Sequence, residues 1–347
     1  MMNILIVRLG ALGDIIHTVP AAAALRAAFP SARIDWLVDA KHRAVVDLVT
    51  VIDRVVVLER SSLPGWIDVA RILRAGRYDV ALDFQGLMKS AILARASGAP
   101  RVIGFSIWHL REKTARPFYS EIAVRGEHPA DASTHVIEKN LGLLHALGVT
   151  DRQIRFPLAE LESPALTQVR AALGEDRDFA LINPGAAWSN KRWPPDRFGE
   201  VAAFLREVRG LPSVVLWGPG EEGLAGAVVD ASEGAARVAP ATGLPDLLAL
   251  CRAAALMVSG DTGPLHVAAA AGTPTVSVFG PTDPLRNGPW AADDVAVSRY
   301  GACGCHYERR CHKASWCLET IATAEVTAAI QQRLGRTVSI DRIPRTQ

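Results

Sequence analysis

The sequence lacks the features that mark membrane-spanning, secreted and nucleic-acid-binding proteins. No uninterrupted apolar stretch reaches the roughly 18 residues that a membrane helix needs. The first residues do not resemble a signal peptide, because Arg8 interrupts the apolar run that begins at Ile4. The formal net charge is only +2, so there is no basic excess of the kind that binds nucleic acid. We therefore expect a cytoplasmic protein without a nucleic-acid partner, which could still contact a membrane surface.

Cysteine is scarce, and most of it is concentrated in one segment. Cys251 stands alone, and the other four cysteines lie close together in the sequence: Cys303, Cys305, Cys311 and Cys317. In a cytosolic protein such a cluster favours metal or redox chemistry over disulfides. Four thiolates could bind a structural metal ion, although the spacing is not the usual C-x-x-C pair. The alternative is a redox-sensitive or purely structural loop.

Short apolar runs alternate with helical segments along most of the chain, which indicates parallel sheets covered by helices on both faces. In the first half the expected strands are 4–7, 34–38, 55–58, 79–83 and 101–104, with helices directly after residue 14 and near 64–75 and 88–97. The pattern restarts with expected strands at 179–182, 213–217, 256–258 and 275–279. The predicted fold class is α/β, with two doubly wound Rossmann-like domains that bind ligands at the carboxyl ends of their strands.

The chain is long enough for two domains. A helix expected over 134–147 ends at Gly148, and the polar, proline-bounded segment from Thr150 to Pro164 is interpreted as an interdomain linker. The last helix, about 323–334, could pack on either domain. We assign residues 1–158 to an N-terminal Rossmann-like domain, 159–325 to a C-terminal one, and 326–347 to a C-terminal helix and tail that could pack back on the N-terminal domain.

The stretch from Leu256 to Gly272 carries the clearest sign of a binding site. An apolar run turns through 259–263 into an alanine-rich helical run, with Pro264 in the first helical turn, where its missing N–H costs little. A strand that ends in a glycine turn at a helix N-terminus presents backbone N–H groups that bind anions. His266 lies in the same first turn. One interpretation is a phosphate or diphosphate site, and the other is an ordinary capped turn.

Asp14 is the residue of the first half that is best suited to chemistry. It follows the first expected strand, and Gly10 and Gly13 allow a tight turn before it. A carboxylate there could act as a general base, or only as an N-cap, which aspartate favours. The segment from Arg8 to Asp14 is not a dinucleotide-binding fingerprint, because it lacks the G-x-G-x-x-G spacing and the acidic residue that should follow.

Other loops at the ends of expected strands carry groups that suit anionic ligands. Arginine and lysine pair with carboxylate and phosphate, although scattered cations are more often simply solvated. In the first half these loops contain Gln85, Lys89 and Ser90, and then Arg111, Lys113 and Arg116. In the second half the loop 183–195 combines glycine and small residues with Lys191 and Arg192, which suits a diphosphate, and a carboxylate in the loop 217–222 could accept the hydroxyls of a ribose.

Several separated motifs occur in one order along the chain, and together they are far more specific than any one of them. They are 4–14 with 17–20, 83–90, 183–185, 191–194, and 259–266 with 272–274. With these motifs the sequence resembles, over nearly its full length, the ADP-heptose:lipopolysaccharide heptosyltransferases of glycosyltransferase family 9. Their fold is GT-B, with two Rossmann-like domains facing each other across a cleft. The motifs are closest to those of heptosyltransferase I, whereas the cysteine cluster is more similar to heptosyltransferase II.

The resemblance implies an inverting glycosyltransferase that moves a heptose from ADP-L-glycero-D-manno-heptose to the inner core of lipopolysaccharide, at Kdo or at the first heptose. Its partners would be the ADP-heptose donor and a lipid A–Kdo type acceptor, with peripheral contact at the cytoplasmic face of the inner membrane. No cofactor would be required. The competing hypotheses are a nucleotide-sugar epimerase-like enzyme on the same GT-B architecture and a non-catalytic nucleotide-binding sensor.

The resemblance also implies roles for individual residues. Asp14 would be the base that deprotonates the acceptor hydroxyl, and Lys191 would stabilise the charge of the leaving diphosphate. The acceptor would contact Arg8, Lys89 and Arg111. The donor would contact Ala186, Ala187, Lys191, Glu222, Asp261, Thr262, Gly263 and His266. Ala186 and Ala187 stand where heptosyltransferase I has hydroxyl residues, so backbone N–H groups would have to bind the phosphates there.

Overall fold

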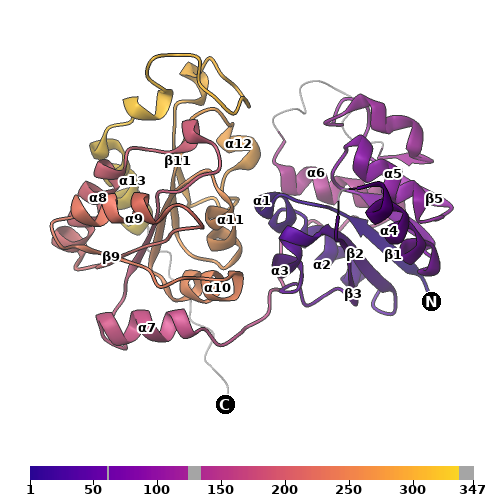
Figure 1. Cartoon of the computed structure of the whole chain (residues 1–347), viewed down its shortest axis with the longest axis horizontal. Helices are drawn as coiled ribbons and strands as arrows, with labels where there is room; N and C mark the ends of the chain where they lie inside the picture. Colours follow the sequence, from indigo (N-terminus) through magenta and orange to yellow (C-terminus); the bar gives the residue numbers. More distant parts are fainter. Residues whose placement is uncertain (61, 124–133, 336–347) are drawn as a thin grey trace. The chain divides into compact units, whose positions relative to one another are not determined.

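The computed structural model describes residues 1–60, 62–123 and 134–335 (Figure 1). The contacts within the chain divide it into two compact units. The first unit consists of Met1–Ser163 with Gly243–Ala249 and Leu285–Asn287, and the second contains the rest of the chain. Each unit has its own six-stranded sheet, so each can be described by itself.

The first unit is built on a parallel sheet with the strand order β3-β2-β1-β4-β5-β6. Its strands are β1 (Asn3–Val7), β2 (Arg33–Asp39), β3 (Arg54–Leu58), β4 (Val80–Asp83), β5 (Arg101–Gly104) and β6 (Glu121–Ile122). Its α-helices in Met1–Ser163 are α1 (Leu12–Ile16), α2 (Val19–Ala28), α3 (Arg43–Val46), α4 (Leu63–Ala75), α5 (Met88–Ala96) and α6 (Val136–Leu143). The central strand β1 is buried from Ile4 to Val7, which explains why it has a continuous apolar sequence.

The second unit has a parallel sheet with the order β12-β11-β10-β7-β8-β9. Its strands are β7 (Ala180–Asn183), β8 (Ser213–Val215), β9 (Ala236–Val238), β10 (Leu256–Gly260), β11 (Thr275–Phe279) and β12 (Val295–Ser298). The helices of this half of the chain are α7 (Pro164–Leu173), α8 (Pro195–Arg209), α9 (Glu222–Asp230), α10 (Leu244–Ala253), α11 (Gly263–Ala270), α12 (Pro284–Asn287) and α13 (Thr323–Gly335). Trp193, Phe198 and Leu205 pack with the strands in its core.

The two sheets have the same topology. When the strands are numbered within each unit, both sheets have the order 3-2-1-4-5-6, in which the winding reverses between strands 1 and 4. This switch point lies between β1 and β4 in the first unit and between β7 and β10 in the second. The predicted α/β class with two doubly wound sheets is therefore confirmed. Ligands of such sheets bind in the loops at the carboxyl ends of the switch-point strands, and those loops position the candidate site.

Two predicted helices are each divided in the structure. The helix expected directly after Asp14 is broken, because α1 ends at Ile16 and α2 begins at Val19 with Pro20 in its first turn. Proline has no N–H for the preceding turn, and its ring clashes with the carbonyl there, so the first helix cannot continue. The helix expected over 134–147 is α6 followed by a 3₁₀ turn that Gly148 closes at φ +74°.

Helix α13 packs on α8, β11 and β12 of the second unit. Val326, Ala329 and Ile330 place its apolar side in that core. The sequence allowed this segment to pack back on the N-terminal domain. In the structure the helix packs on the second unit instead. Residues 336–347 lie outside the described part of the chain, so the packing of the tail stays a prediction.

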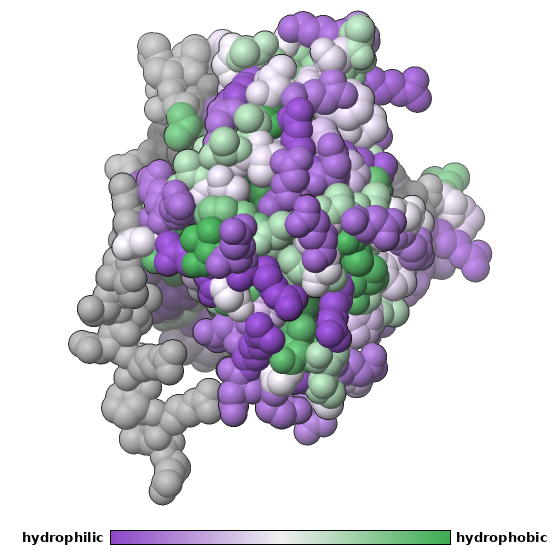
Figure 2. All heavy atoms as spheres, turned by 90° about the vertical axis from the view of Figure 1, so that its left-hand side faces the viewer, coloured by the Kyte–Doolittle hydropathy of each residue, from purple (hydrophilic) through white to green (hydrophobic). Residues whose placement is uncertain are grey.

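One face of the second unit is mostly hydrophilic. Figure 2 shows that face, where hydrophobic residues gather in small separate groups between polar ones. In the described part of the chain no helix is both long enough and apolar enough to span a membrane.

Candidate active site

Asp14 lies in the turn between β1 and α1. It is the third residue of α1, and the N-cap is Ala11, so Asp14 is not the N-cap that one interpretation of the sequence made it. Its Oδ2 accepts a hydrogen bond from the Ala11 N–H at 3.4 Å, and the partial positive charge of the first helical turn favours a carboxylate there. A Cβ at Gly10 would lie 2.3 Å from Cδ2 of His42, so a larger residue in this turn would displace that imidazole.

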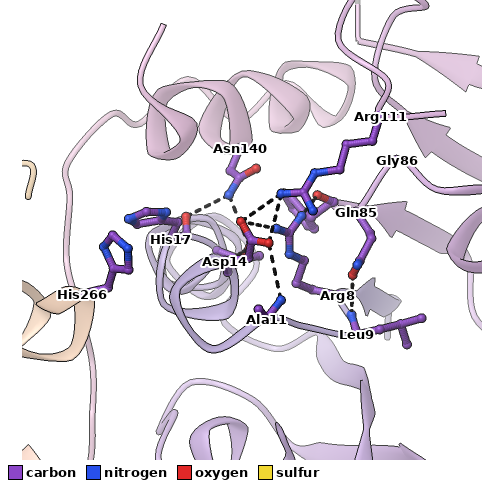
Figure 3. Close-up of polar contacts among 12 residues, drawn as sticks. Arg8, Leu9, Ala11, Asp14, His17, Gln85, Gly86, Arg111, Asn140 and His266 are labelled. Atoms are coloured by element: carbon purple, nitrogen blue, oxygen red, sulfur yellow. Dashed lines mark hydrogen bonds and ion pairs between the residues drawn. The ribbon is translucent and has the colours of Figure 1, made fainter. Parts of the chain in front are cut away.

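Two arginines hold the carboxylate of Asp14 (Figure 3). Arg8 Nη2 lies 2.7 Å from Oδ1, and Arg111 Nη2 lies 3.0 Å from Oδ2. The Arg8 side chain is 3% exposed, whereas that of Arg111 is 43% exposed. Burial alone would raise the pKa of Asp14, but the charges of Arg8 and Arg111 outweigh burial and hold this pKa well below its usual range. Asp14 is therefore ionised, and it is a weak base while both guanidinium groups are bound.

Helix α6 fixes the turn that carries Asp14 (Figure 3). Asn140 Nδ2 donates hydrogen bonds to the carbonyl oxygen of His17 at 2.8 Å and to Thr18 Oγ1 at 3.3 Å. Thr18 Oγ1 in turn donates to the backbone oxygen of Asp14 at 2.9 Å. Asn140 is buried, and the sequence analysis did not select it. These bonds make the position of the carboxylate depend on a helix more than a hundred residues away in the sequence.

The loop after β4 has a mainly structural role. Gln85 Oε1 accepts a hydrogen bond from the Leu9 N–H at 2.8 Å, which ties this loop to the loop after β1. The buried Asp83 accepts hydrogen bonds from Tyr119 Oη at 2.7 Å and from Ser90 Oγ at 2.8 Å. Burial raises the pKa of Asp83. The polar side chains of this motif thus stabilise the switch point.

The residues predicted to bind the acceptor lie in two places. Arg8 and Arg111 meet at Asp14, whereas Lys89 Nζ lies 3.6 Å from Oδ2 of Asp39. Because Arg8 is almost fully buried, its position suits orienting Asp14 more than touching a substrate. Arg111 is the exposed member of the cluster, and its guanidinium is the one that a ligand can reach.

Lys191 and Asp261 form the charged centre at the switch point of the second unit. Lys191 Nζ lies 2.5 Å from Asp261 Oδ2, which also accepts a hydrogen bond from Thr282 Oγ1 at 2.5 Å. His266 Nε2 lies 3.4 Å from Oδ1 of the same carboxylate. Burial would raise the pKa of Asp261, but the hydrogen bond from His266 and the charge of Lys191 hold it well below its usual range. A carboxylate by itself repels a diphosphate, so Asp261 does not bind one directly. Its role is to orient Lys191 and His266.

The strand–turn–helix predicted for the stretch from Leu256 to Gly272 is confirmed by β10 and α11. Thr262 is the N-cap of α11, but its side chain makes no capping bond. Its Oγ1 instead accepts a hydrogen bond from Asn183 Nδ2 at 3.0 Å. The side chain of Thr262 therefore does not compete for the first-turn N–H groups of α11, which are suited to an anion.

The loop after β7 brings Lys191 to this turn. A Cβ at Gly260 would lie 2.9 Å from the Lys191 carbonyl oxygen, so a glycine there allows the two loops to approach closely. The Lys191 ammonium lies 4.5 Å from the centroid of the Trp188 ring. Ala186 is buried and its carbonyl accepts a hydrogen bond from Arg192 Nε at 2.8 Å. Ala187 is exposed, and only its backbone N–H can donate a hydrogen bond.

Two adjacent glutamates lie near this loop, and the sequence selected only one of them. Glu222 is exposed at the first position of α9. Glu221 Oε1 lies 3.7 Å from Arg192 Nη2, and its Oε2 accepts a hydrogen bond from the Gly218 N–H at 3.2 Å. A Cβ at Gly185 would lie 2.1 Å from Glu221 Oε2. Glu221 is therefore the carboxylate that contacts the loop after β7, and nothing in the spacing distinguishes it from its neighbour.

The cysteine cluster consists of thiols that contact one another. The Sγ atoms of Cys303 and Cys305 lie 3.4 Å apart, and all five cysteines are free. Burial, followed by hydrogen bonds with neighbouring thiols, raises the pKa of Cys305 to about 12 and that of Cys317 to about 11. Within residues 1–60, 62–123 and 134–335, no group of three or more histidine, cysteine, aspartate or glutamate side chains is placed to hold a metal ion. The structure thus gives no support to a metal bound by Cys303, Cys305, Cys311 and Cys317.

Comparison with known proteins assigns the chain to one family. The sequence model of glycosyltransferase family 9 (heptosyltransferase) matches residues 66–316. The chain is 30% identical to lipopolysaccharide heptosyltransferase 1 of Pseudomonas aeruginosa, over 89% of this chain and 87% of that protein. It is 28% identical to lipopolysaccharide heptosyltransferase 3 of Escherichia coli K12, over 82% of this chain and 84% of that protein.

Solved structures of the family share the fold. A glycosyltransferase family 9 protein from Veillonella parvula superposes with a TM-score of 0.80 at 26% identity, covering 96% of this chain and 97% of that chain. An E. coli heptosyltransferase with ADP-2-deoxy-2-fluoro heptose superposes with a TM-score of 0.73 at 23% identity, covering 97% and 100%. The match to the family over more than half of the sequence and the 30% identical relative show that this chain is a glycosyltransferase with the GT-B fold, belonging to glycosyltransferase family 9, the heptosyltransferases.

Proposed function

We propose that this protein transfers a heptose from ADP-L-glycero-D-manno-heptose to the inner core of lipopolysaccharide, at Kdo or at the first heptose, with inversion at the anomeric carbon. The observation that carries the proposal is the chemistry of the two switch points. One holds the ionised carboxylate of Asp14, and the other holds Lys191 beside the N-terminus of α11. These are the groups that accept a proton from a sugar hydroxyl and stabilise a departing diphosphate.

The donor diphosphate would bind at the second unit. Lys191 is only 15% exposed and is paired with Asp261, so its ammonium is held in place before a ligand arrives. The first-turn N–H groups of α11 add donors that need no reorganisation when charge develops. Arg192 and Glu221 flank the loop after β7, where Glu221 or Glu222 would accept ribose hydroxyls. Charge stabilisation from these groups requires no cofactor.

The acceptor hydroxyl would be deprotonated by Asp14. In the structure two guanidinium groups depress the pKa of this carboxylate, which weakens it as a base. Arg8 is buried and stays in place, but the exposed Arg111 can exchange Asp14 for an anionic group of the acceptor. Losing one of two positive neighbours raises the pKa of Asp14 when the acceptor is bound. We therefore assign Arg111 the role of binding the acceptor and Arg8 that of orienting the base.

The transfer is balanced without a metal or redox step. The acceptor oxygen forms a bond to the anomeric carbon while the bond from this carbon to the diphosphate oxygen breaks. The hydroxyl proton goes to Asp14, and ADP leaves with the electron pair of the broken bond. Attack from the face opposite the leaving group inverts the configuration.

A lipid-linked acceptor implies peripheral contact with the cytoplasmic face of the inner membrane. In the loop after β5, Ile107 is 42% exposed and Trp108 is 61% exposed, three to four residues before Arg111. An exposed tryptophan beside an arginine suits the boundary between lipid and water.

The proposal is tested by incubating the protein with ADP-heptose and deacylated Kdo-lipid A and measuring ADP release. We expect release that depends on the acceptor, and a product with the inverted anomeric configuration by NMR. An epimerase-like enzyme would change the donor without an acceptor, and a sensor would bind ADP without turnover. ADP release that does not depend on any inner-core acceptor would exclude the proposed transfer.

A further inference from the structure

A polar cavity lies in the first unit, and its lining residues are outside the motifs that the sequence selected. It has a volume of about 500 Å³. Its lining includes Phe105, Ser106 and His109 from the loop after β5, and Glu138 and Lys139 from α6, with Arg152 beyond them. Two cations, a carboxylate, a hydroxyl and an imidazole around one space are the composition of a binding site for a polar, charged ligand.

Lys139 is held in a defined position on this cavity. Its Nζ donates a hydrogen bond to the carbonyl oxygen of His109 at 2.6 Å and lies 4.4 Å from the centroid of the Phe105 ring. The hydrogen bond uses one of the three N–H groups of an ammonium. The aromatic face stabilises the cation without neutralising it. The side chain is thus ordered before binding, which lowers the entropic cost of capturing an anion.

The charges around the cavity suit a single negative charge. Arg152 Nη1 lies 3.4 Å from Oε2 of Glu138, so these two groups largely neutralise each other. Among the side chains that line the cavity, Lys139 and Arg152 against Glu138 make two positive charges and one negative, which leaves the positive charge that Lys139 carries below its pKa of about 7. Ser106 Oγ and His109 Nδ1 lie 3.0 Å apart and add polar groups for a neutral part of a ligand.

The same two segments that line the cavity also hold the proposed base. The loop after β5 contributes His109 to the cavity and, two residues later, Arg111 to the carboxylate of Asp14. Helix α6 contributes Lys139 to the cavity and the next residue, Asn140, to the turn that carries Asp14. A ligand in the cavity is therefore next to the segments that position the reacting hydroxyl.

We propose that this cavity is the subsite for the carboxylate of an acidic acceptor sugar, and that Lys139 selects for this charge. The proposal rests on the proposed transfer to an inner-core acceptor and adds the group that recognises it. A carboxylate fits better than a phosphate, because the cavity offers one uncompensated positive charge and a phosphate carries close to two negative charges at neutral pH. Lys139 is a specificity-determining residue in this account, and Asp14 remains the base.

The test compares an acid with its neutral amide. The methyl glycoside of Kdo and its carboxamide are titrated into the full chain by calorimetry below pH 7, where Lys139 carries its charge, for the wild type, Lys139→Gln, Lys139→Arg and Arg71→Gln. Gln keeps an N–H donor and removes the charge on a side chain one atom shorter, whereas Arg keeps the charge. Arg71 lies exposed on α4 and is the control for loss of one positive charge in the same unit. Circular dichroism of each variant establishes that it is folded.

We expect the wild type and Arg71→Gln to bind the acid at least about tenfold more tightly than the amide, as one charged hydrogen bond allows. In Lys139→Gln the preference should fall to about one, and Lys139→Arg should keep most of it. Equal loss of acid and amide binding would indicate a merely structural role and overturn the proposal. An unchanged preference in Lys139→Gln, saturation by inorganic phosphate in place of the acid, or no saturable binding of the acid at millimolar concentration would also overturn it.

The binding test does not depend on turnover, so the two proposals can fail separately. If the wild type releases ADP with Kdo-lipid A but shows no preference for the acid, the proposed function stands and the carboxylate subsite is rejected. A wild type that prefers the acid through Lys139 but does not release ADP retains the subsite and loses the transferase.

Discussion

The two switch points have the same topology and different electrostatics. In both, a carboxylate beside the carboxyl ends of strands 1 and 4 is paired with basic side chains, Asp14 with two arginines and Asp261 with Lys191. The second pair is closed, with Lys191 15% and Asp261 7% exposed. The first is half open, since Arg111 is 43% exposed. The same fold thus holds the charge of Lys191 in place in the second unit and leaves Arg111 free to move in the first.

This difference separates binding from proton transfer. A group that stabilises a leaving diphosphate acts best when its charge is held in place before the reaction. A base has to change its proton affinity when the substrate arrives, and an exposed arginine that can exchange partners allows this. We therefore assign ADP binding to the second unit and the change in the pKa of a carboxylate to the first.

The largest effect is expected for Asp14→Asn, which removes the base and keeps the shape of the side chain. Turnover should fall by about 10²–10⁴-fold, the usual contribution of a general base. Steady-state ADP release with saturating donor and acceptor measures it. Asp68→Asn on α4 is the matched control, because Asp68 is exposed and outside both sites. Near-normal turnover in Asp14→Asn would show that Asp14 is not the base and only stabilises α1.

Lys191→Met should lower turnover by about 10²–10³-fold, as the loss of one preorganised donor does. It should also lower the free energy of unfolding by about 3 kcal/mol, because it leaves Asp261 buried without its cation. The double variant Lys191→Met, Asp261→Asn should regain part of that stability and none of the turnover. Denaturant titration and ADP release measure the two quantities separately. Recovery of turnover in the double variant would contradict a catalytic role for Lys191.

Arg111→Gln should shift the pH dependence of turnover and cost about tenfold in kcat/KM, the value of one charge-assisted contact. Removing a positive neighbour raises the pKa of Asp14, so the base becomes protonated at a higher pH and activity is lost at a higher pH on the acidic side. Arg43→Gln, an exposed arginine on α3, is the control. If Arg111→Gln loses activity at the same acidic pH as the wild type, Arg111 does not set the pKa of Asp14.

The smallest effect concerns pH and Lys139. Burial, followed by the charges of Arg286, Arg111 and Arg8 and opposed by Asp14, lowers the pKa of Lys139 to about 7. Below that pH the ammonium is present, and above it the charge is lost. Binding of the acidic glycoside should therefore weaken as the pH rises through about 7, by about tenfold in total, which is the affinity expected from the charge of Lys139. In Lys139→Gln the same titration should be flat, and an equal slope in both proteins would assign the pH dependence to another group.

The sequence predicted the fold well, because its signal is the alternation of buried strands with amphipathic helices. Strands such as β1 and β10 are buried along their whole length, and their continuous apolar runs locate them. The strands that escaped prediction are short and partly exposed, as in β9, where Arg237 and Val238 are exposed, or β6, which has two residues.

The candidate site was predicted only in part, because motifs locate loops and not the partners of their side chains. The sequence selected both Asp14 and Arg111, but their contact joins residues 97 apart and depends on the packing of two loops. Lys139 has the sequence context of a solvated lysine on an amphipathic helix, and only the position of Phe105 and His109 shows that it lines a cavity. The choice between Glu221 and Glu222 depends on how α9 begins.

The division of work between the units is tested most directly by titrating ADP into the wild type, Asp14→Asn and Lys191→Met by calorimetry. The account predicts that Asp14→Asn binds ADP as the wild type does and that Lys191→Met binds it about tenfold or more weakly, as the loss of a charge-assisted contact to phosphate requires. Equal weakening in both variants, or unchanged affinity in Lys191→Met, would contradict it.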